Sequence, residues 1–433
     1  MKEGNMKKKN ILIIIMTICI LILPLNVYAE SNVNIEYKKA EQKVLEDTPE
    51  IGCKAAYIAE PTTGKIIYEK NAHEKRFPAS TTKILTALLA LEKCELTDKA
   101  IVSQNALDLV PAGYSNAGLK VGEELDIKTL LYALLIPSAN EAANVLAEHI
   151  SGSVESFAEL CNNRAEELGC ETLHFVNPNG IHDEEHYCSA YDLYLIAKEC
   201  RKYDVFNEIV KTKSFTVPTT NVYPKKDRTY KNTNSLIQPN EKNYYYEYCT
   251  GIKTGHTTPA GECLVASSSY NDIDLISVVL GGGTNSKGLN ERFYDTKQLF
   301  EFTYDNYSFK QIANKNQVIT NINVNKATKE TAELDIIIDT DIKSIAPINM
   351  ENIETTFILN DNIEAPIMQN DVLGKVTFKV DGLNYTANIV ASHNVEKIPY
   401  WIYNTIFIVG ILLILLIIHI IIKKKRRTSK YEY

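Results

Sequence analysis

The sequence predicts a mixed α/β (α+β) domain with an antiparallel sheet and a helical cluster, followed by a small all-β domain and one membrane-spanning helix. Apolar, strand-like runs lie near both ends of residues 30–305, and amphipathic helical stretches lie between them. Apolar and polar residues alternate through much of residues 306–394. The largely apolar stretch at residues 402–422 is long enough to span a bilayer.

Residues 1–29 have the pattern of a secretory signal peptide. Lys7 to Lys9 precede an apolar core from Ile11 to Leu23, and Val27-Tyr28-Ala29 supplies the small residues of a cleavage site. The apolar run is short for a membrane span. We therefore expect cleavage after Ala29 and export of the rest of the chain.

The expected elements of residues 30–305 follow in chain order. Strand-like runs at 55–58 and 65–68 flank the turn Pro61-Thr62-Thr63-Gly64 and predict a hairpin. A helix follows Pro78, and Ser189 with Asp192 predicts a capping box at the start of a later helix. The further helices are expected at 126–135, 141–150, 154–168, 189–200 and 287–304, and the further β runs at 263–269 and 275–280.

The C-terminal stretch has the features of a membrane anchor. Tyr400, Trp401 and Tyr403 form an interfacial aromatic belt before the apolar residues 402–422. Five cations, Lys423 to Arg427, follow at once, and such clusters stay on the cytoplasmic side. We expect a single-pass protein of the cell membrane with an extracytoplasmic body and a basic cytoplasmic tail, residues 423–433.

Composition limits the function further. The formal net charge is −8 although both ends are basic, so the body between them is acidic, which argues against nucleic-acid binding. The nine cysteines include no C-x-x-C pair, so we expect no zinc site and no cofactor. One cysteine lies in the signal core, and we expect the other eight to be mostly free, buried thiols.

The first chemical motif is Ser80-x-x-Lys83, at the start of the helix after Pro78. The spacing of three residues puts both side chains on one helical face. A lysine amine can take the proton of a serine hydroxyl when burial or another cation lowers its pKa. The helix N-terminus adds partial positive charge near a developing oxyanion. Taken alone, the motif favours a capped helix with a surface serine and lysine.

The second motif is Ser138-Ala139-Asn140, in the turn after Pro137. At alternate positions, the hydroxyl of Ser138 and the carboxamide of Asn140 can point into one cleft. The first would relay a proton, and the second would hold a substrate carbonyl or the catalytic lysine. The alternative is a simple helix cap before Glu141.

The third motif is Lys253-Thr254-Gly255-His256, just before the later β runs. Lys253 and Thr254 can bind a terminal carboxylate. Gly255 has no side chain, so a substrate backbone can lie against that strand. The alternative is an edge strand with a protective lysine.

Together and in this order, the three motifs resemble the set found in penicillin-binding proteins and class A β-lactamases. The sequence resembles the low-molecular-mass penicillin-binding proteins that act as serine-type D-alanyl-D-alanine carboxypeptidases, strongly over residues 37–304 and weakly over the β domain. The resemblance implies a DD-peptidase/β-lactamase-like fold for residues 30–305. Ala139 stands where the family often has glycine. The stretches that carry the resemblance beyond the motifs are Pro78–Lys83, His174–Gly180, Asn232–Asn234 and Gly251–Thr257.

The resemblance also implies the roles of the residues and the partners. Ser80 would attack the penultimate carbonyl of a peptidoglycan stem peptide that ends in D-Ala-D-Ala, Lys83 would take its proton, and Ser138 would pass a proton to the leaving D-alanine. Penicillins and other β-lactams would acylate Ser80 and leave slowly. The backbone N–H groups of Ser80 and His256 would form the oxyanion hole. The substrate-binding residues would be Asn140, Lys253, Thr254, Gly255 and His256.

Three alternatives remain. His182-Asp-Glu-Glu185-His186 matches an inverted zinc-peptidase motif, although the neighbouring turn favours a loop over the helix which that chemistry needs. A non-catalytic sensor of penicillin or peptidoglycan would use the same cleft without turnover. A class A β-lactamase would need a deacylating glutamate between the second and third motifs. No Glu-x-x-Leu-Asn occurs there, and the segment runs Asn177-Pro-Asn-Gly-Ile-His-Asp183 instead.

Overall fold

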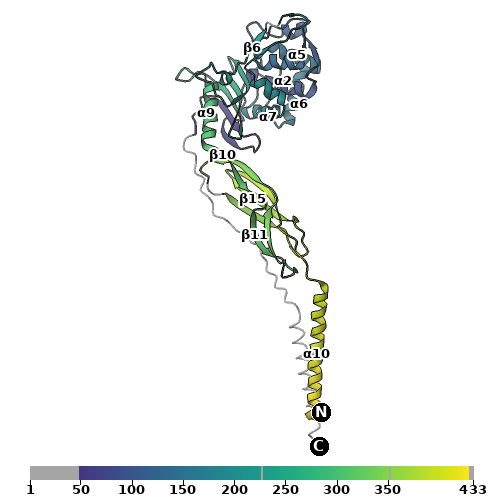
Figure 1. The fold of residues 1–433 in the computed structure, drawn as a ribbon. Helices are drawn as coiled ribbons and strands as arrows, with labels where there is room; N and C mark the ends of the chain where they lie inside the picture. Colours follow the sequence, from purple (N-terminus) through teal and green to yellow (C-terminus); the bar gives the residue numbers. More distant parts are fainter. Residues whose placement is uncertain (1–47, 226–227, 351–352, 429–433) are drawn as a thin grey trace.

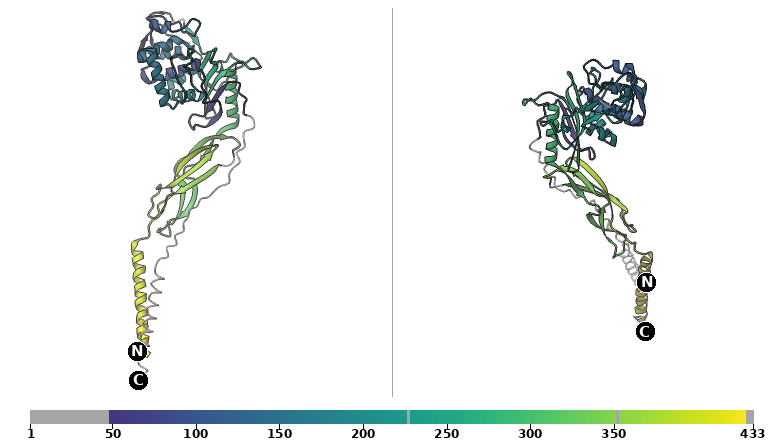
Figure 2. Two further views of the ribbon diagram at one scale, coloured as in Figure 1. Left: turned by 180° about the vertical axis from the view of Figure 1, so that it is seen from behind. Right: turned by 45° about the horizontal axis from the view of Figure 1, so that its top comes forward.

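The structure is a computed structural model that describes residues 48–225, 228–350 and 353–428. The predicted signal peptide lies outside the described residues. Three parts follow one another in chain order: a mixed helix-and-sheet head, an all-β domain and a long C-terminal helix (Figure 1). The view from behind gives the same order of parts (Figure 2).

The head is built on one five-stranded antiparallel sheet. Its two hairpins, β1–β2 and β7–β8, are joined through β9, which pairs with both β1 and β8. The expected hairpin at residues 55–68 is therefore present and lies at one edge. In spatial order the strands are β2 (Ile66–Lys70), β1 (Ala55–Ala59), β9 (Ile273–Gly282), β8 (Gly261–Tyr270) and β7 (Cys249–Thr257).

Both faces of this sheet are covered, which explains the continuous apolar runs in its strands. In β1, Ala55, Tyr57 and Ala59 point into the core shared with the helical cluster. Ala56 and Ile58 point the other way, into the core beneath α9 (Glu291–Asn306). The head is thus a helix–sheet–helix sandwich. The sequence predicted its antiparallel sheet and helical cluster, but not that α9 would cover the second face.

The predicted helices of the cluster are present, and the structure adds α3, α8 and η2, which the sequence pattern did not predict. Ser189 and Asp192 form the expected capping box, in which each accepts a backbone N–H of the other. Helix α9 begins at Glu291, later than the apolar pattern suggested, because Asn290 is its N-cap. The helical elements before α9 are the 3₁₀ turn η1 (Ala79–Thr82), α2 (Lys83–Lys93), α3 (Gln104–Asp108), α4 (Ile127–Leu135), α5 (Asn140–Ser151), α6 (Val154–Glu167), α7 (Ala190–Cys200), α8 (Asp204–Lys211) and η2 (Ser235–Ile237).

Two short ribbons lie outside the main sheet. One joins β3 (Lys99–Ile101) to β4 (Glu124–Asp126), and the other joins β5 (Ser214–Thr216) to β6 (Thr229–Lys231). The sequence pattern did not predict β3, β4 or β6, because three-residue strands carry too few residues for a visible alternation.

The all-β domain follows α9 directly, as expected. It has a five-stranded antiparallel sheet and a two-stranded ribbon that share one apolar core. The sheet runs in the order β11 (Val318–Asn323), β12 (Glu333–Ile338), β16 (Leu383–Ala391), β15 (Val372–Val380) and β14 (Glu354–Leu359), and the ribbon pairs β10 (Tyr307–Ala313) with β13 (Ile342–Pro347).

Side chains of both domains meet at their junction. Tyr307, the first residue of β10, packs in the core beneath α9 together with Ile345 of β13. Lys65, before β2, forms an ion pair with Asp381 in the β15–β16 turn, with 2.7 Å between Nζ and Oδ2. Both side chains are largely buried, so solvent screens this pair less than a surface pair.

The C-terminal helix α10 spans Tyr400–Thr428. Within the part of the chain that the structure describes, its segment Tyr400–Lys424 is the one helix long and apolar enough to cross a membrane, and none of that segment is buried. Large apolar side chains are therefore exposed along it, which suits a lipid environment better than water.

The β-domain core yields a stability prediction. Ile389 on β16 is fully buried, whereas Ile358 on the edge strand β14 is 75% exposed. Ile389→Ala should lower the free energy of unfolding of this domain by about 2–5 kcal/mol, because a cavity remains. Ile358→Ala, the matched control, should change it by less than about 0.5 kcal/mol. Calorimetry of the detergent-solubilised chain measures both, and equal losses would contradict the assigned core.

Candidate active site

Ser80 lies in the tight turn η1 that leads into α2. Pro78 precedes this turn, and Ala79 adopts a left-handed backbone conformation with φ of 48°. Such a conformation is uncommon for a residue with a side chain and indicates a constrained segment. The turn holds Ser80 at the N-terminal end of α2, close to the position that the sequence predicts.

Lys83, the first residue of α2, is completely buried. Its Nζ donates hydrogen bonds to three oxygens: Ser80 Oγ at 2.9 Å, Asn140 Oδ1 at 2.8 Å and the Asn179 carbonyl at 2.5 Å. The predicted proximity of Ser80 and Lys83 is therefore present. Asn140 contacts the lysine, one of the two functions that its carboxamide could have.

The electrostatic surroundings lower the pKa of Lys83 well below its ordinary value. Burial is the main cause, because desolvation disfavours the ammonium form, and the positive charge of Lys253 adds to it. The carboxylate of Glu141 opposes this shift. Lys253 is also buried, and its pKa is lowered to about 7 by burial and then by Arg292.

Ser138 and Asn140 lie in the turn between α4 and α5. Ser138 has a left-handed backbone with φ of 68°, and its hydroxyl is buried with no hydrogen-bond partner among the described residues. A buried, unpaired hydroxyl costs about 1–3 kcal/mol, so a functional reason for it is expected. Asn140 is fixed on its other side, since its Nδ2 donates to the Ser115 carbonyl at 2.8 Å.

Strand β7 brings the third motif against the Ser80 turn. A Cβ at Gly255 would lie 2.9 Å from the Pro78 carbonyl oxygen and 3.1 Å from Ser80 N. The glycine therefore permits close approach of β7 to the backbone of Ser80. The sequence alone suggests a different role for this glycine, the close approach of a substrate backbone.

The other residues of this motif differ in exposure. Thr254 is buried and shares a 2.5 Å hydrogen bond with Thr233, while the Lys253 ammonium donates to the Thr254 carbonyl at 2.8 Å. The His256 side chain is 57% exposed and contacts Glu262, with 3.1 Å between Nδ1 and Oε1. Glu262 in turn pairs with Arg292, whose Nη1 donates to the Gly255 carbonyl.

One part of the site lacked an assigned role in the sequence analysis: the turn Asn177-Pro178-Asn179-Gly180. Its Asn179 carbonyl accepts from Lys83, and Gly180 packs directly on the Ser80 turn. The turn itself was recognisable from its residue types. Its contact with Lys83 was not, because a backbone carbonyl carries no side-chain signature.

The zinc alternative does not fit the geometry of this loop. His182 and His186 lie in a loop rather than on one helical face. His186 is buried, and both ring nitrogens are used, since Nδ1 accepts from Val176 N–H and Nε2 contacts Thr82 Oγ1 at 2.8 Å. Burial lowers the pKa of His186 to about 3, so the ring is neutral and supports the turn that carries Ser80.

Family models match two parts of the chain. The model described as D-alanyl-D-alanine carboxypeptidase matches residues 41–284, and the model described as penicillin-binding protein 5, C-terminal domain, matches residues 307–397.

Individual relatives support the same family assignment. D-alanyl-D-alanine carboxypeptidase DacF of Bacillus subtilis (strain 168) is 34% identical over 337 residues, which cover 76% of this chain and 82% of that protein. The crystal structure of penicillin binding protein 5 from Haemophilus influenzae is 26% identical, with a TM-score of 0.63, and covers 81% of this chain and 99% of that one. The Streptomyces K15 DD-transpeptidase is 31% identical, with a TM-score of 0.53, and covers 59% and 98%.

The packing of Gly180 yields a prediction with an internal control. Gly180 (φ +80°) and Gly169 (φ +83°) share a left-handed backbone, but a Cβ at Gly180 would lie 1.9 Å from the Ala79 carbonyl oxygen, and one at Gly169 would meet nothing within 4 Å. Gly169→Ala should cost about 1–2 kcal/mol of strain. Gly180→Ala should cost about 1–3 kcal/mol more, because the Ser80 turn must shift. Chemical denaturation measures both, and equal costs would contradict the close packing.

Proposed function

This chain belongs to the D-alanyl-D-alanine carboxypeptidase family, and we propose that it removes the terminal D-alanine from peptidoglycan stem peptides through an acyl-enzyme on Ser80. It is a serine-type carboxypeptidase and a penicillin-binding protein. The observation that carries the proposal for the site is the buried Lys83 amine, 2.9 Å from the Ser80 hydroxyl. A β-lactam, which mimics the substrate, would acylate the same oxygen.

The hydrogen-bond partners of Lys83 favour its role as the base. The Asn140 Oδ1 and Asn179 carbonyl oxygens only accept hydrogen bonds, whereas the Ser80 hydroxyl can also donate one. A neutral amine has two N–H bonds and one lone pair. When the two N–H bonds serve the two carbonyl-type oxygens, the lone pair is left for the Ser80 hydroxyl. Lys83 can then take the Ser80 proton as the oxygen attacks.

The other site residues support the remaining steps. Lys253 and Thr254 would bind the terminal carboxylate, because the ammonium and hydroxyl are both donors. The backbone N–H groups of Ser80 and His256 would form the oxyanion hole, in line with the close approach of β7 at Gly255. Ser138, with its unpaired hydroxyl, would return the proton to the leaving D-alanine. Water then hydrolyses the ester on Ser80.

We also propose a division of the chain into five segments. The division into a signal peptide (1–29), a catalytic domain (30–305), an all-β domain (306–394), a membrane span (402–422) and a tail (423–433) accords with the exposed apolar helix α10. The catalytic domain would face the cell wall and the basic tail the cytoplasm, which follows from the cation cluster after the span.

Ser80→Ala gives the direct test. Penicillin should add one covalent adduct to the wild-type chain and none to Ser80→Ala, measured by intact mass, and D-alanine release from a D-Ala-D-Ala pentapeptide should be lost in parallel. Ser156→Ala, in the exposed first turn of α6, should keep both activities. An adduct retained by Ser80→Ala would overturn the assignment of the nucleophile.

The same assay separates the alternatives. Without a deacylating glutamate, the penicillin ester should persist while the natural acyl-enzyme turns over. Rapid turnover of penicillin with no D-alanine released would indicate a β-lactamase. Binding of the stem peptide without release of D-alanine would indicate a sensor.

The two buried lysines predict the pH dependence of kcat/KM. Lys83 acts as a base only when neutral, so activity should rise with pH on a limb well below the ordinary lysine pKa of 10.5. Lys253 binds a carboxylate only when charged, so activity should fall as pH rises above about 7. Arginine stays charged throughout this range. Lys253→Arg should therefore remove the alkaline limb, and an unchanged limb would exclude Lys253 as its source.

A further inference from the structure

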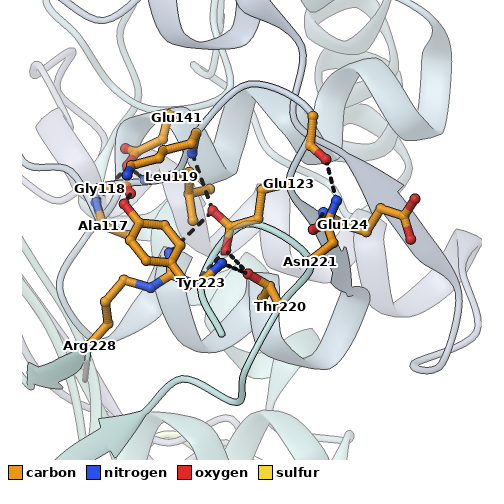
Figure 3. Close-up of polar contacts among 12 residues, drawn as sticks. Ala117, Gly118, Leu119, Glu123, Glu124, Glu141, Thr220, Asn221, Tyr223 and Arg228 are labelled. Atoms are coloured by element: carbon orange, nitrogen blue, oxygen red, sulfur yellow. Dashed lines mark hydrogen bonds and ion pairs between the residues drawn. The ribbon is translucent and has the colours of Figure 1, made fainter. Parts of the chain in front are cut away.

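A segment at the edge of the helical cluster ties two distant parts of the catalytic domain together. We call residues 115–124, which precede α4, the strap, and we call residues 217–225 with 228–231, around β6, the arm. The arm lies against the strap, and side chains of the arm form hydrogen bonds with the Glu123 side chain and with backbone atoms of the strap (Figure 3). Neither the strap nor the arm contains a residue of the three motifs.

The centre of this contact is a buried charge. The Glu123 side chain has no exposed surface, and the Arg228 guanidinium, 11% exposed, donates to both carboxylate oxygens. Thr220 Oγ1 donates to the same carboxylate at 2.9 Å, and the Lys120 backbone N–H donates at 3.2 Å. Removing one partner from a buried ion pair leaves an uncompensated charge, so the loss of Arg228 would disrupt the contact between arm and strap.

Further hydrogen bonds run along the strap. Tyr230 OH donates to the Ala117 carbonyl at 2.6 Å, and Tyr223 OH donates to the Gly118 carbonyl at 2.8 Å. Asn221 accepts from Glu124 N–H at 2.9 Å and donates to the Gly122 carbonyl at 2.7 Å. The arm therefore fixes the strap's backbone at successive residues rather than at a single point.

The other end of the strap contacts Asn140, which in turn contacts Lys83. The Ser115 carbonyl accepts from both the backbone N–H and the Nδ2 of Asn140. The Oδ1 of the same carboxamide accepts from Lys83 Nζ. Next to it, Glu141 Oε1 accepts from the Ala117 N–H at 2.6 Å, so the strap is held from the helix side as well. A displacement of the strap would rotate the Asn140 carboxamide away from Lys83.

We propose that Glu123 and Arg228 are positioning residues for the acyl-transfer reaction, acting through the strap and Asn140 to hold Lys83 at the Ser80 hydroxyl. This inference rests on the proposed carboxypeptidase function. The pair itself does not touch the reacting atoms. Loss of the Glu123–Arg228 pair would displace the base, Lys83, but would leave the carboxylate site at Lys253 and Thr254 in place. Loss of a substrate-binding residue would have the opposite effect.

The test compares Arg228→Met with the same substitution at a second arginine that forms an ion pair, Arg164. Arg228→Met should lower kcat about 10- to 100-fold with KM nearly unchanged, because an ångström-scale shift of a catalytic group has an effect of this order. The kcat is expressed per site titrated with penicillin, which removes any unfolded fraction. The control is Arg164→Met, which breaks a second, less buried Arg–Glu pair, with Glu92, between α6 and α2. Among the described residues, no hydrogen bond or ion pair links this pair to a residue of the three motifs. Arg164→Met should leave kcat per titrated site unchanged.

A second set of variants separates the effect of the ion pair on kcat from the effect of side-chain packing. Arg228→Lys, which keeps the charge, should recover part of the lost kcat. Glu123→Gln with Arg228→Met should be less impaired than the sum of the single variants, since it leaves no unpaired charge. Equal kcat losses in Arg228→Met and Arg164→Met, or a loss confined to KM, would overturn the inference. A wild-type chain that releases no D-alanine would instead refute the proposed function.

Discussion

The catalytic domain depends on keeping one lysine amine out of water without giving it a carboxylate to bond. Each of the three oxygens within hydrogen-bond distance of Lys83 Nζ is uncharged, and each comes from a different segment. A salt bridge at this position would hold the ammonium form and suppress its basicity. Burial with neutral acceptors satisfies the amine in the folded state and still allows it to lose a proton. The turn at Ser80, the start of α5 and the Asn179 turn must all meet at this atom.

This constraint accounts for the unusual backbone around the site. Ala79 and Ser138 have left-handed conformations, and Gly180 and Gly255 lie where a Cβ would strike the Ser80 turn. Each feature brings a loop closer to Lys83 or Ser80 than ordinary residues allow. The sheet and the helical cluster, which are regular, supply the rigid frame on which these irregular turns rest.

The sequence predicted those features that depend on the types of side chain and on their spacing. The spacing of Ser80 and Lys83 indicated a shared helical face, and the order of strands and helices indicated an antiparallel sheet with a helical cluster. The contacts made by backbone atoms were not predictable. The carbonyls of Asn179 and Ser115 are identical to every other carbonyl in the sequence, and only the folded chain brings them to Lys83 and Asn140. Likewise, Glu123 and Arg228 are 105 residues apart, and nothing in their local sequence indicates that they pair.

The burial of the cysteines affects how the protein reacts with oxidants. All eight in the described chain are unpaired, and six are buried. Burial raises the pKa of every one of these thiols, for example that of Cys263 to about 11 and that of Cys249 to about 12. Oxidants and disulfides react with the thiolate, so the folded protein offers them almost none at neutral pH. If the chain is exported as we propose, it needs no oxidising catalyst to fold, and its thiols are open to oxidation only before they are buried.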